Sequence, residues 1–264
     1  MRKTLTTLLL TLLCTVAGAW GGTEHRLMAY MAQGHLTKNT QAFLDRYLDM
    51  PIMEYATWMD RYRDSPGYKE TTRWHMVSVD ADGNFEPDGL GKAIPKLTKA
   101  LDILRNWREY NDSTVYINIV YVIHLVPEIH CPAHYYLGKL GDAKELRRRG
   151  WQPIYIKGKE VKYHGFWDGI ITRLYPGITP DQFVELFDNW TPEKQKEVSD
   201  GTPADWGRDN ITRISQIYDW CQYGDTVPDD FAEQHRWLPE IQVRLGAYRL
   251  ARTLNDLFDK EVTK

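Results

Sequence analysis

The sequence has little excess charge of either sign, no long hydrophobic run and only three cysteines in 264 residues. Its 33 basic residues are outnumbered by 36 acidic ones, which argues against a protein that coats nucleic acid through a broad basic face. Internal repeats, low-complexity tracts and linkers rich in Pro, Gly or Ser are also missing. These absences leave one large domain as the expected organisation.

The first nineteen residues have the features of a secretory signal peptide. A basic start precedes a short apolar run at 8–13, and the small residues Ala17-Gly18-Ala19 follow it. The apolar run is too short for a membrane anchor. A lipoprotein signal ending at Cys14 is disfavoured because a large leucine precedes that cysteine. We expect cleavage at the end of 1–19, export to the periplasm or the medium, and a mature domain over 20–264.

The mature chain that this cleavage would produce is more acidic and keeps two cysteines. Without Arg2 and Lys3, the 33 basic residues become 31 against 36 acidic ones, a formal net charge of −5. Cys131 and Cys221 could form one disulfide in an oxidising compartment or remain two buried thiols. The sequence leaves both possibilities open.

Helix signals recur along the chain. Thr179, Thr191 and Thr202 each precede a proline, and a threonine N-cap before a proline at the first helical position is a typical helix start. The stretch 115–129 is rich in β-branched residues and could form a strand, but its length favours a buried central helix. Between 138 and 162 we expect a long loop, with a short hairpin near its end. The predicted fold is all-α, a single multi-helix domain.

Two pairs of ligand-type side chains are spaced for one helix face. His124 precedes Glu128 by four residues, and His164 precedes Asp168 by the same interval. His134 follows shortly after the first pair. Imidazole and carboxylate are a ligand mix that suits zinc.

Each pair alone is a weak signal, because a lone histidine on an apolar helix is more often a hydrogen-bonded core residue. An isolated His-x-x-x-Asp is also more often a surface pair. The order of the whole set is more informative. A Trp at the predicted new terminus is followed by His25, Asp60, His75, and then by the two spaced pairs.

This ordered set resembles the S1/P1-type single-strand nucleases of fungi and plants, which are relatives of bacterial zinc phospholipases C. The mature chain of that family opens with Trp and has a His five residues on, as Trp20 and His25 do here. Its central H-x-x-x-D-x-x-x-x-x-H pattern is similar to 124–134, and its last H-x-x-W-D element, with one more residue between, is similar to 164–168. The resemblance extends from residue 20 to about 258.

The resemblance implies three zinc ions and nine ligand residues. One zinc would be held by Asp60, His75, His124 and Glu128. A second would be held by the amino nitrogen and carbonyl oxygen of Trp20, by His25 and by the shared carboxylate of Glu128. A third would be held by His134, His164 and Asp168, and His130 would be a structural neighbour rather than a ligand.

The chain departs from the family pattern at several positions. Glu128 stands where the family has Asp, Pro127 replaces a glycine and Cys131 replaces a glutamine. Ser78 stands where the family has an Asp that orients the attacking water, with Asp80 two residues further on. A serine can still hydrogen-bond the nucleophile, although more weakly than a carboxylate. We therefore assign catalytic roles to Ser78 and Glu128.

The implied function is zinc-dependent hydrolysis of phosphodiester bonds in single-stranded DNA or RNA, or in nucleotides, without a stable nucleic-acid complex and without a membrane span. Zinc lowers the pKa of bound water and stabilises phosphate oxygens, so an acidic chain can still act on a polyanion. Two alternatives remain: a phospholipase C-like enzyme acting on a lipid head group, with Trp151 or Trp237 at an exposed loop tip, and a degenerate zinc-binding protein. The oligomeric state cannot be read from the sequence.

Overall fold

The computed structural model describes residues 20–80, 82–86, 89–138, 153–221 and 224–260, so the predicted signal peptide lies outside the described residues. In chain order the elements are α1 (Gly22–Gln33), α2 (Lys38–Leu44), α3 (Ile52–Tyr55), α4 (Trp58–Tyr62), the 3-10 helix η1 (Lys69–His75), β1 (Val77–Val79), α5 (Ala93–Arg105), the 3-10 helix η2 (Trp107–Glu109), α6 (Asp112–Glu128), β2 (Tyr135–Leu137), β3 (Pro153–Ile156), β4 (Lys159–Lys162), α8 (Tyr163–Asp168), α9 (Ile170–Leu174), α10 (Pro180–Phe187), α11 (Pro192–Ser199), α12 (Pro203–Ile214), α13 (Ile217–Trp220), α14 (Phe231–Gln234) and α15 (Trp237–Phe258).

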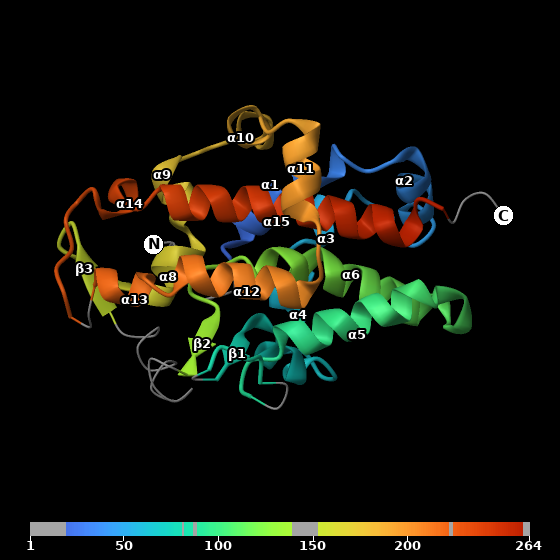
Figure 1. Cartoon of the computed structure of the whole chain (residues 1–264), viewed down its shortest axis with the longest axis horizontal. Helices are drawn as coiled ribbons and strands as arrows, with labels where there is room; N and C mark the ends of the chain where they lie inside the picture. The colour runs from blue at the N-terminus through green and yellow to red at the C-terminus, as the bar shows by residue number, and fades with distance from the viewer. Residues whose placement is uncertain (1–19, 81, 87–88, 139–152, 222–223, 261–264) are drawn as a thin grey trace, which may run out of the picture.

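The described chain is mainly helical, and the predicted all-α fold is confirmed. Helices α5, α6, α12 and α15 run along the long axis of the molecule (Figure 1). Helix α6 packs against α5, α15 and α1, and α1 also packs against α15. Among the described residues, no helix is long and apolar enough to cross a membrane.

Helix α6 is the buried central helix that the sequence predicted over 115–129. Ile119, Val120, Val122 and Leu125 point in different directions around the helix and are completely buried, so the helix is covered around much of its circumference. Pro127 lies in its last turn, and the helix ends at Glu128. This end, which carries a buried carboxylate, fixes the position of the candidate site.

The three predicted threonine caps all begin helices. Thr179, Thr191 and Thr202 start α10, α11 and α12, and each side chain accepts a hydrogen bond from the main-chain N–H three residues later. At α10 and α12, the residue that donates this N–H also accepts a hydrogen bond, through its side chain, from the main-chain N–H of the capping threonine. The two bonds together form a capping box. The local sequence signal therefore placed these helix starts correctly.

In the described part of the chain, two small sheets accompany the helices. The predicted hairpin exists as the antiparallel pair β3–β4, and its turn uses Lys157 and Gly158 at φ of 51° and 68°. The loop residues 139–152 before it lie outside the described part of the chain. The parallel pair β1–β2 was not predicted, because three-residue strands are too short to show a period. It aligns Val77 with Tyr135 and so brings the end of η1 beside the segment that follows α6.

Candidate metal centre

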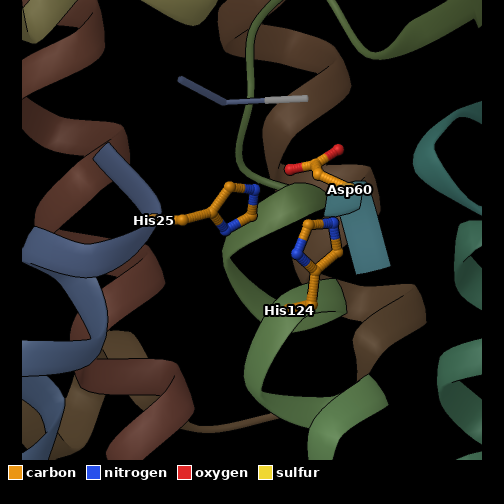
Figure 2. Close-up of side chains that lie close together, drawn as sticks. All are labelled: His25, Asp60 and His124. Atoms are coloured by element: carbon orange, nitrogen blue, oxygen red, sulfur yellow. The ribbon is translucent and has the colours of Figure 1, made fainter. Parts of the chain in front are cut away.

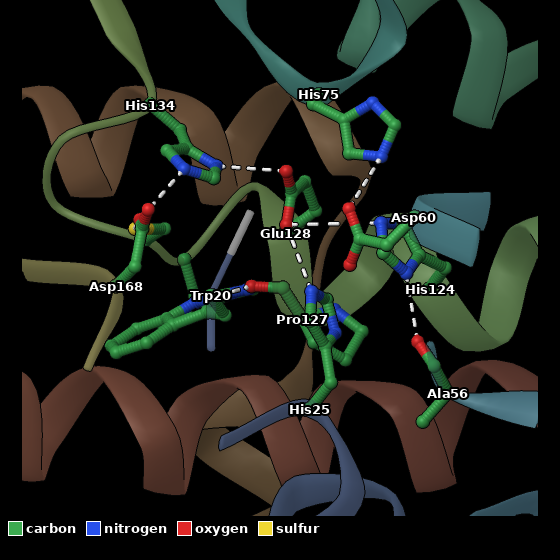
Figure 3. Close-up of polar contacts among 12 residues, drawn as sticks. Trp20, His25, Ala56, Asp60, His75, His124, Pro127, Glu128, His134 and Asp168 are labelled. Carbon is green, nitrogen blue, oxygen red and sulfur yellow. Dashed lines mark hydrogen bonds and ion pairs between the residues drawn. The ribbon is translucent and has the colours of Figure 1, made fainter. Parts of the chain in front are cut away.

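The side chains predicted to bind metal converge at the end of α6. Helix α1 supplies His25, α4 supplies Asp60 and η1 supplies His75, while α8 supplies His164 and Asp168. Glu128 lies between the groups, with His134 and Asp168 on one side and Asp60, His75 and His124 on the other (Figure 3). Six of the eight side chains are at most 5% exposed, and His164 is 8% exposed.

The first cluster forms around Asp60. Ligand atoms of His25, Asp60 and His124 all lie within 4.8 Å of one another, with the carboxylate facing the two stacked imidazoles (Figure 2). His75 Nε2 lies 3.4 Å from Asp60 Oδ1. Burial alone would raise the pKa of Asp60, but the nearby His75 and the neighbouring imidazoles lower it.

Two of these imidazoles are held in a ligand-competent tautomer. His124 Nδ1–H donates to Ala56 O at 2.7 Å, and His75 Nδ1–H donates to Thr71 O at 2.9 Å. Each Nε2 is therefore left with a lone pair, as metal-binding histidines require. Burial lowers the pKa of His124 to about 4 and that of His25 well below its usual value, so both rings are neutral near neutral pH.

Glu128 connects the first cluster to the second. Its Oε2 lies 3.0 Å from His25 Nε2 and 3.9 Å from His124 Nε2. Its Oε1 lies 2.9 Å from His134 Nδ1, although the angles are not those of a hydrogen bond. Burial raises the pKa of Glu128 well above its usual value.

The second cluster contains His134, His164 and Asp168. His134 Nε2 lies 3.2 Å from both His164 Nε2 and Asp168 Oδ1, and His164 Nε2 lies 3.3 Å from Asp168 Oδ2. As the spacing predicted, His164 and Asp168 lie on the same face of α8. Burial raises the pKa of Asp168 to about 7 and lowers that of His164 well below its usual value.

The predicted mature N-terminus lies inside the site. Trp20 is completely buried, and its indole Nε1–H donates to Pro127 O at 3.0 Å. Its main-chain N–H bonds to the Glu128 carboxylate, and the following Gly21 N–H donates to Asp168 O at 2.7 Å. Residues 20 and 21 are therefore bonded to Glu128 and to Asp168, two of the predicted metal ligands.

The arrangement fits bound metal ions, as the unpaired polar atoms show. Buried polar groups are normally hydrogen-bonded, and bringing imidazoles and carboxylates together without partners is costly. Divalent cations would satisfy these lone pairs, and the mix of nitrogen and oxygen donors suits zinc. Among the described residues, the buried site atoms without a hydrogen-bond partner are His25 Nδ1, Asp60 Oδ1, His75 Nε2, His124 Nε2, Glu128 Oε1, His134 Nδ1 and Asp168 Oδ2.

Ser78 faces a neighbouring loop. It lies on β1, is 2% exposed, and its Oγ accepts a hydrogen bond from Gly91 N–H at 2.8 Å. Asp80 is engaged in its own turn, where its Oδ1 accepts from the main-chain N–H groups of Asp82 and Asn84. The water-orienting role of Ser78 stays a prediction.

His130 belongs to a different network. Its Nδ1–H donates to Val126 O at 2.7 Å, and its Nε2 lies 2.9 Å from Arg249 Nη1. Arg249 is 3% exposed and also donates to Asp209 and to Val198 O. This network connects α15 to the segment after α6 and agrees with a structural role for His130.

Two residues near the site were not singled out as functional from the sequence. Arg63 Nη1 lies 3.5 Å from Asp60 Oδ1, and the i, i+3 spacing on α4 was the available signal. Cys131 Sγ lies 3.6 Å from Asp168 Oδ1, and its Cys-x-x-His spacing to His134 is of a kind found in zinc sites. Both cysteines in the described chain, Cys131 and Cys221, are free and buried.

A cavity of about 990 Å³ opens beside the centre. Its wall includes Trp20, Asp60 and Asp168, which are site residues, and Gly21 to Thr23 at the start of α1. Apart from Asp60 and Asp168, its lining contains one acidic residue, Glu160, and more basic residues. The basic residues are Arg26, Arg61, Lys162 and Arg173.

Comparison with known proteins gives one family and several distant relatives. The family model for S1/P1 nuclease matches residues 20–259. The chain is 24% identical to Nuclease S1 of Aspergillus oryzae over 56% of its own length, and this match spans only about half of that relative, 53%. It is 24% identical to Endonuclease 3 of Arabidopsis thaliana over 95% of its length and 93% of the relative. Endonuclease 4 of the same plant is 23% identical with similar coverage.

Proposed function

The chain belongs to the S1/P1 nuclease family, and we propose that it hydrolyses phosphodiester bonds of single-stranded nucleic acid or nucleotides at a centre of three zinc ions. The observation that carries the proposal is the convergence of buried imidazole and carboxylate atoms that lack hydrogen-bond partners at the end of α6. Zinc-dependent phosphodiester hydrolysis is the chemistry that family membership implies. The number of zinc ions and the substrate are our own proposal.

The family resemblance implies a division of the ligands between three neighbouring positions. Asp60, His75, His124 and Glu128 would hold one zinc. The Trp20 amino nitrogen and carbonyl oxygen, His25 and Glu128 would hold the next. His134, His164 and Asp168 would hold the third. Glu128 can serve the first two positions because its Oε2 lies 3.9 Å from His124 Nε2 and 3.0 Å from His25 Nε2.

The protein's own residues would prepare the site for this chemistry. Bound zinc supplies a water of lowered pKa and positive charge for phosphate oxygens. Burial keeps His25, His124 and His164 neutral, so that their nitrogens remain available as ligands. The hydrogen bonds to Ala56 O and Thr71 O keep His124 and His75 oriented. Because these groups are pre-positioned, little reorganisation is needed when substrate binds.

The adjacent cavity offers a path for a phosphodiester. Arg61, Lys162 and Arg173 line it together with the site residues Asp60 and Asp168, and these cations can attract phosphate groups locally in an acidic protein. Two aromatic residues close in sequence to the ligands of the third zinc cannot stack on a base. Phe166 and Tyr135 are completely buried in the core, so neither offers a face to a base.

A lipid-directed activity has weaker support. Trp237 is 45% exposed but lies against Trp220, with ring centroids 6.3 Å apart, and Trp151 lies outside the described residues. A single exposed aromatic side chain is ordinary on a protein surface. We also propose that residues 1–19 direct export and are removed, which would place the enzyme in the periplasm or outside the cell.

The proposal is tested by comparing three substrates with zinc-loaded protein: denatured DNA, phosphatidylcholine and bis-nitrophenyl phosphate. We expect rapid cleavage of denatured DNA and little release of the lipid head group. Cleavage of the lipid alone would identify a phospholipase C-like enzyme. Bound zinc without turnover of any substrate would identify a degenerate zinc protein.

A further inference from the structure

We propose that the thiolate of Cys131 is an additional ligand of the metal ion held by His134 and Asp168, an inference that rests on the proposed function. Ligand atoms of Cys131, His134 and Asp168 lie within 4.8 Å of one another. Cys131 is completely buried. Its position carries a glutamine in the family pattern, so the feature belongs to this chain.

Two distances among the ligand atoms of Cys131, His134, His164 and Asp168 match edges of a tetrahedral zinc site. With a Zn–S bond of about 2.3 Å and a Zn–O bond of about 2.1 Å, a tetrahedral angle separates sulfur and oxygen by about 3.6 Å. Cys131 Sγ lies 3.6 Å from Asp168 Oδ1. The same calculation with Zn–N bonds gives about 3.3 Å between two nitrogens, and His134 Nε2 lies 3.2 Å from His164 Nε2.

The turn after α6 brings the thiol to this position. The N–H of Cys131 donates to Glu128 O at 3.0 Å, and the N–H of His134 donates to Cys131 O at 3.2 Å. This pair of bonds curls the chain around Pro132, so that a Cys-x-x-His segment meets α8. Spacings of two to four residues between ligands are common where a single turn supplies two zinc ligands.

An unpartnered oxygen provides independent support. Asp168 is 4% exposed, and its Oδ2 has no hydrogen-bond partner among the described residues. A thiol is a weak donor and satisfies only part of this buried carboxylate. A metal ion between sulfur, carboxylate and imidazole would satisfy all three, and the thiol proton would leave to solvent as the metal binds.

The proposed ligand changes what this metal position can do. With His164 the set reaches four protein side chains, which is the complete shell of a tetrahedral zinc. A thiolate also favours soft metal ions over magnesium or manganese. We therefore expect tight retention of zinc or cadmium here, and a water ligand would have to expand this shell or displace one of the four side chains.

Cobalt substitution tests the inference without relying on activity. In the mature chain that begins at Trp20, Cys221→Ser leaves Cys131 as the only thiol. Cys221 is also buried but contacts Tyr163, so removing it should leave the metal centre unchanged. We expect the Co²⁺-loaded Cys221→Ser variant to show a thiolate-to-cobalt charge-transfer band in the near ultraviolet. Adding Cys131→Ser should abolish that band and weaken retention of one metal about tenfold or more against a chelator.

The outcomes separate this inference from the proposed function. Tetrahedral cobalt bands in the visible without the charge-transfer band would show a metal centre that lacks the thiolate, and would overturn the Cys131 assignment alone. Absence of any bound cobalt or zinc would overturn the metal centre itself. Because the decisive measurement uses the protein with Cys131 intact, it distinguishes these outcomes even if Cys131→Ser folds poorly.

Discussion

Glu128 Oε2 lies 3.0 Å from His25 Nε2, and both side chains are completely buried. One residue ends the central helix α6, and the other lies in the first turns of α1. Because the second oxygen of the same carboxylate lies beside His134, Glu128 is the point at which the two halves of the candidate centre meet.

Replacing Glu128 by Gln should weaken metal binding at both positions that share its carboxylate. The change keeps the shape and removes the negative charge, so we expect loss of at least one zinc and a fall in hydrolysis of about a hundredfold or more. Elemental analysis and a DNA cleavage assay measure the two effects. Glu24→Gln is a matched control, because Glu24 is also buried but bonds to Thr172 N–H. Full zinc content in Glu128→Gln would exclude the bridging role.

The zinc proposed to bind His134, His164 and Asp168 can be removed without changing the other ligands. His164→Ala should lose one zinc and most activity, because it removes one side of the cluster with His134 and Asp168. His35→Ala is the comparison, since His35 pairs with Asp188 outside the clusters and should keep all zinc. If both variants retain metal and rate equally, His164 is not part of the site.

Zinc binding should depend on pH through Asp168 more than through His124. Burial has already lowered the pKa of His124 to about 4, so this ring is neutral at pH 6. Asp168, with its pKa raised to about 7, is protonated below that pH and must lose its proton before it binds metal. Apparent affinity should therefore rise from pH 6 to pH 7, by up to about tenfold for this one proton.

A competition titration with a chelating dye, corrected for the protonation of the dye, measures this dependence. Equal affinities at pH 6 and pH 8 would mean that Asp168 is already ionised without metal. A dependence that persists unchanged in Asp168→Asn would assign it to another group, of which Glu128 is the nearest candidate because burial also raises its pKa.

Arg249 should matter for stability and little for metal content. Arg249→Leu would leave His130 Nε2 and Val198 O without their donor in a buried region, a change that typically costs about 2–4 kcal/mol. Chemical denaturation of the zinc-loaded protein measures the loss. Exposed Arg208, which pairs with Asp205 on α12, provides the control, because its replacement should cost less than about 1 kcal/mol. Loss of zinc in Arg249→Leu would instead connect His130 to the metal centre.

An extension before Trp20 should remove one zinc. A free α-amino group has a pKa of about 7.7–8.0 in model compounds and can yield its proton to a metal, whereas an amide N–H cannot bind zinc well. A chain that begins at Trp20 should therefore bind one zinc more, and cleave single-stranded DNA much faster, than a chain with two further residues. Equal zinc content and equal rates would remove the N-terminal ligand from the scheme.

The sequence predicted the helices best where local chemistry determines them. Thr179 and Thr202 begin helices because a side-chain oxygen can satisfy a free N–H within three residues. Helix α6 followed from its long apolar run. The convergence of His25, Asp60 and Glu128 could not follow from spacing, since these residues lie far apart in the sequence. The family resemblance supplied that expectation.

Other features depend on packing that no local pattern records. The β1–β2 pair is held by tertiary contacts and places Ser78 against the loop at Gly91. The position of Cys131 beside Asp168 needs both the turn after α6 and the docking of α8. Arg63 and Asp60 are a local pair at the end of α4, but in the sequence they are one i, i+3 pair among many of equal spacing.

The burial of Trp20 also bears on the order of events during maturation. In the folded chain the indole is completely enclosed, and Gly21 N–H is bonded to Asp168 O. A processing protease must hold the residues on both sides of its cleavage point in an extended form, which this packing forbids. Removal of 1–19 would therefore have to come before the N-terminal segment docks. Once this segment has folded into place, the protease could no longer cleave the chain and activate it.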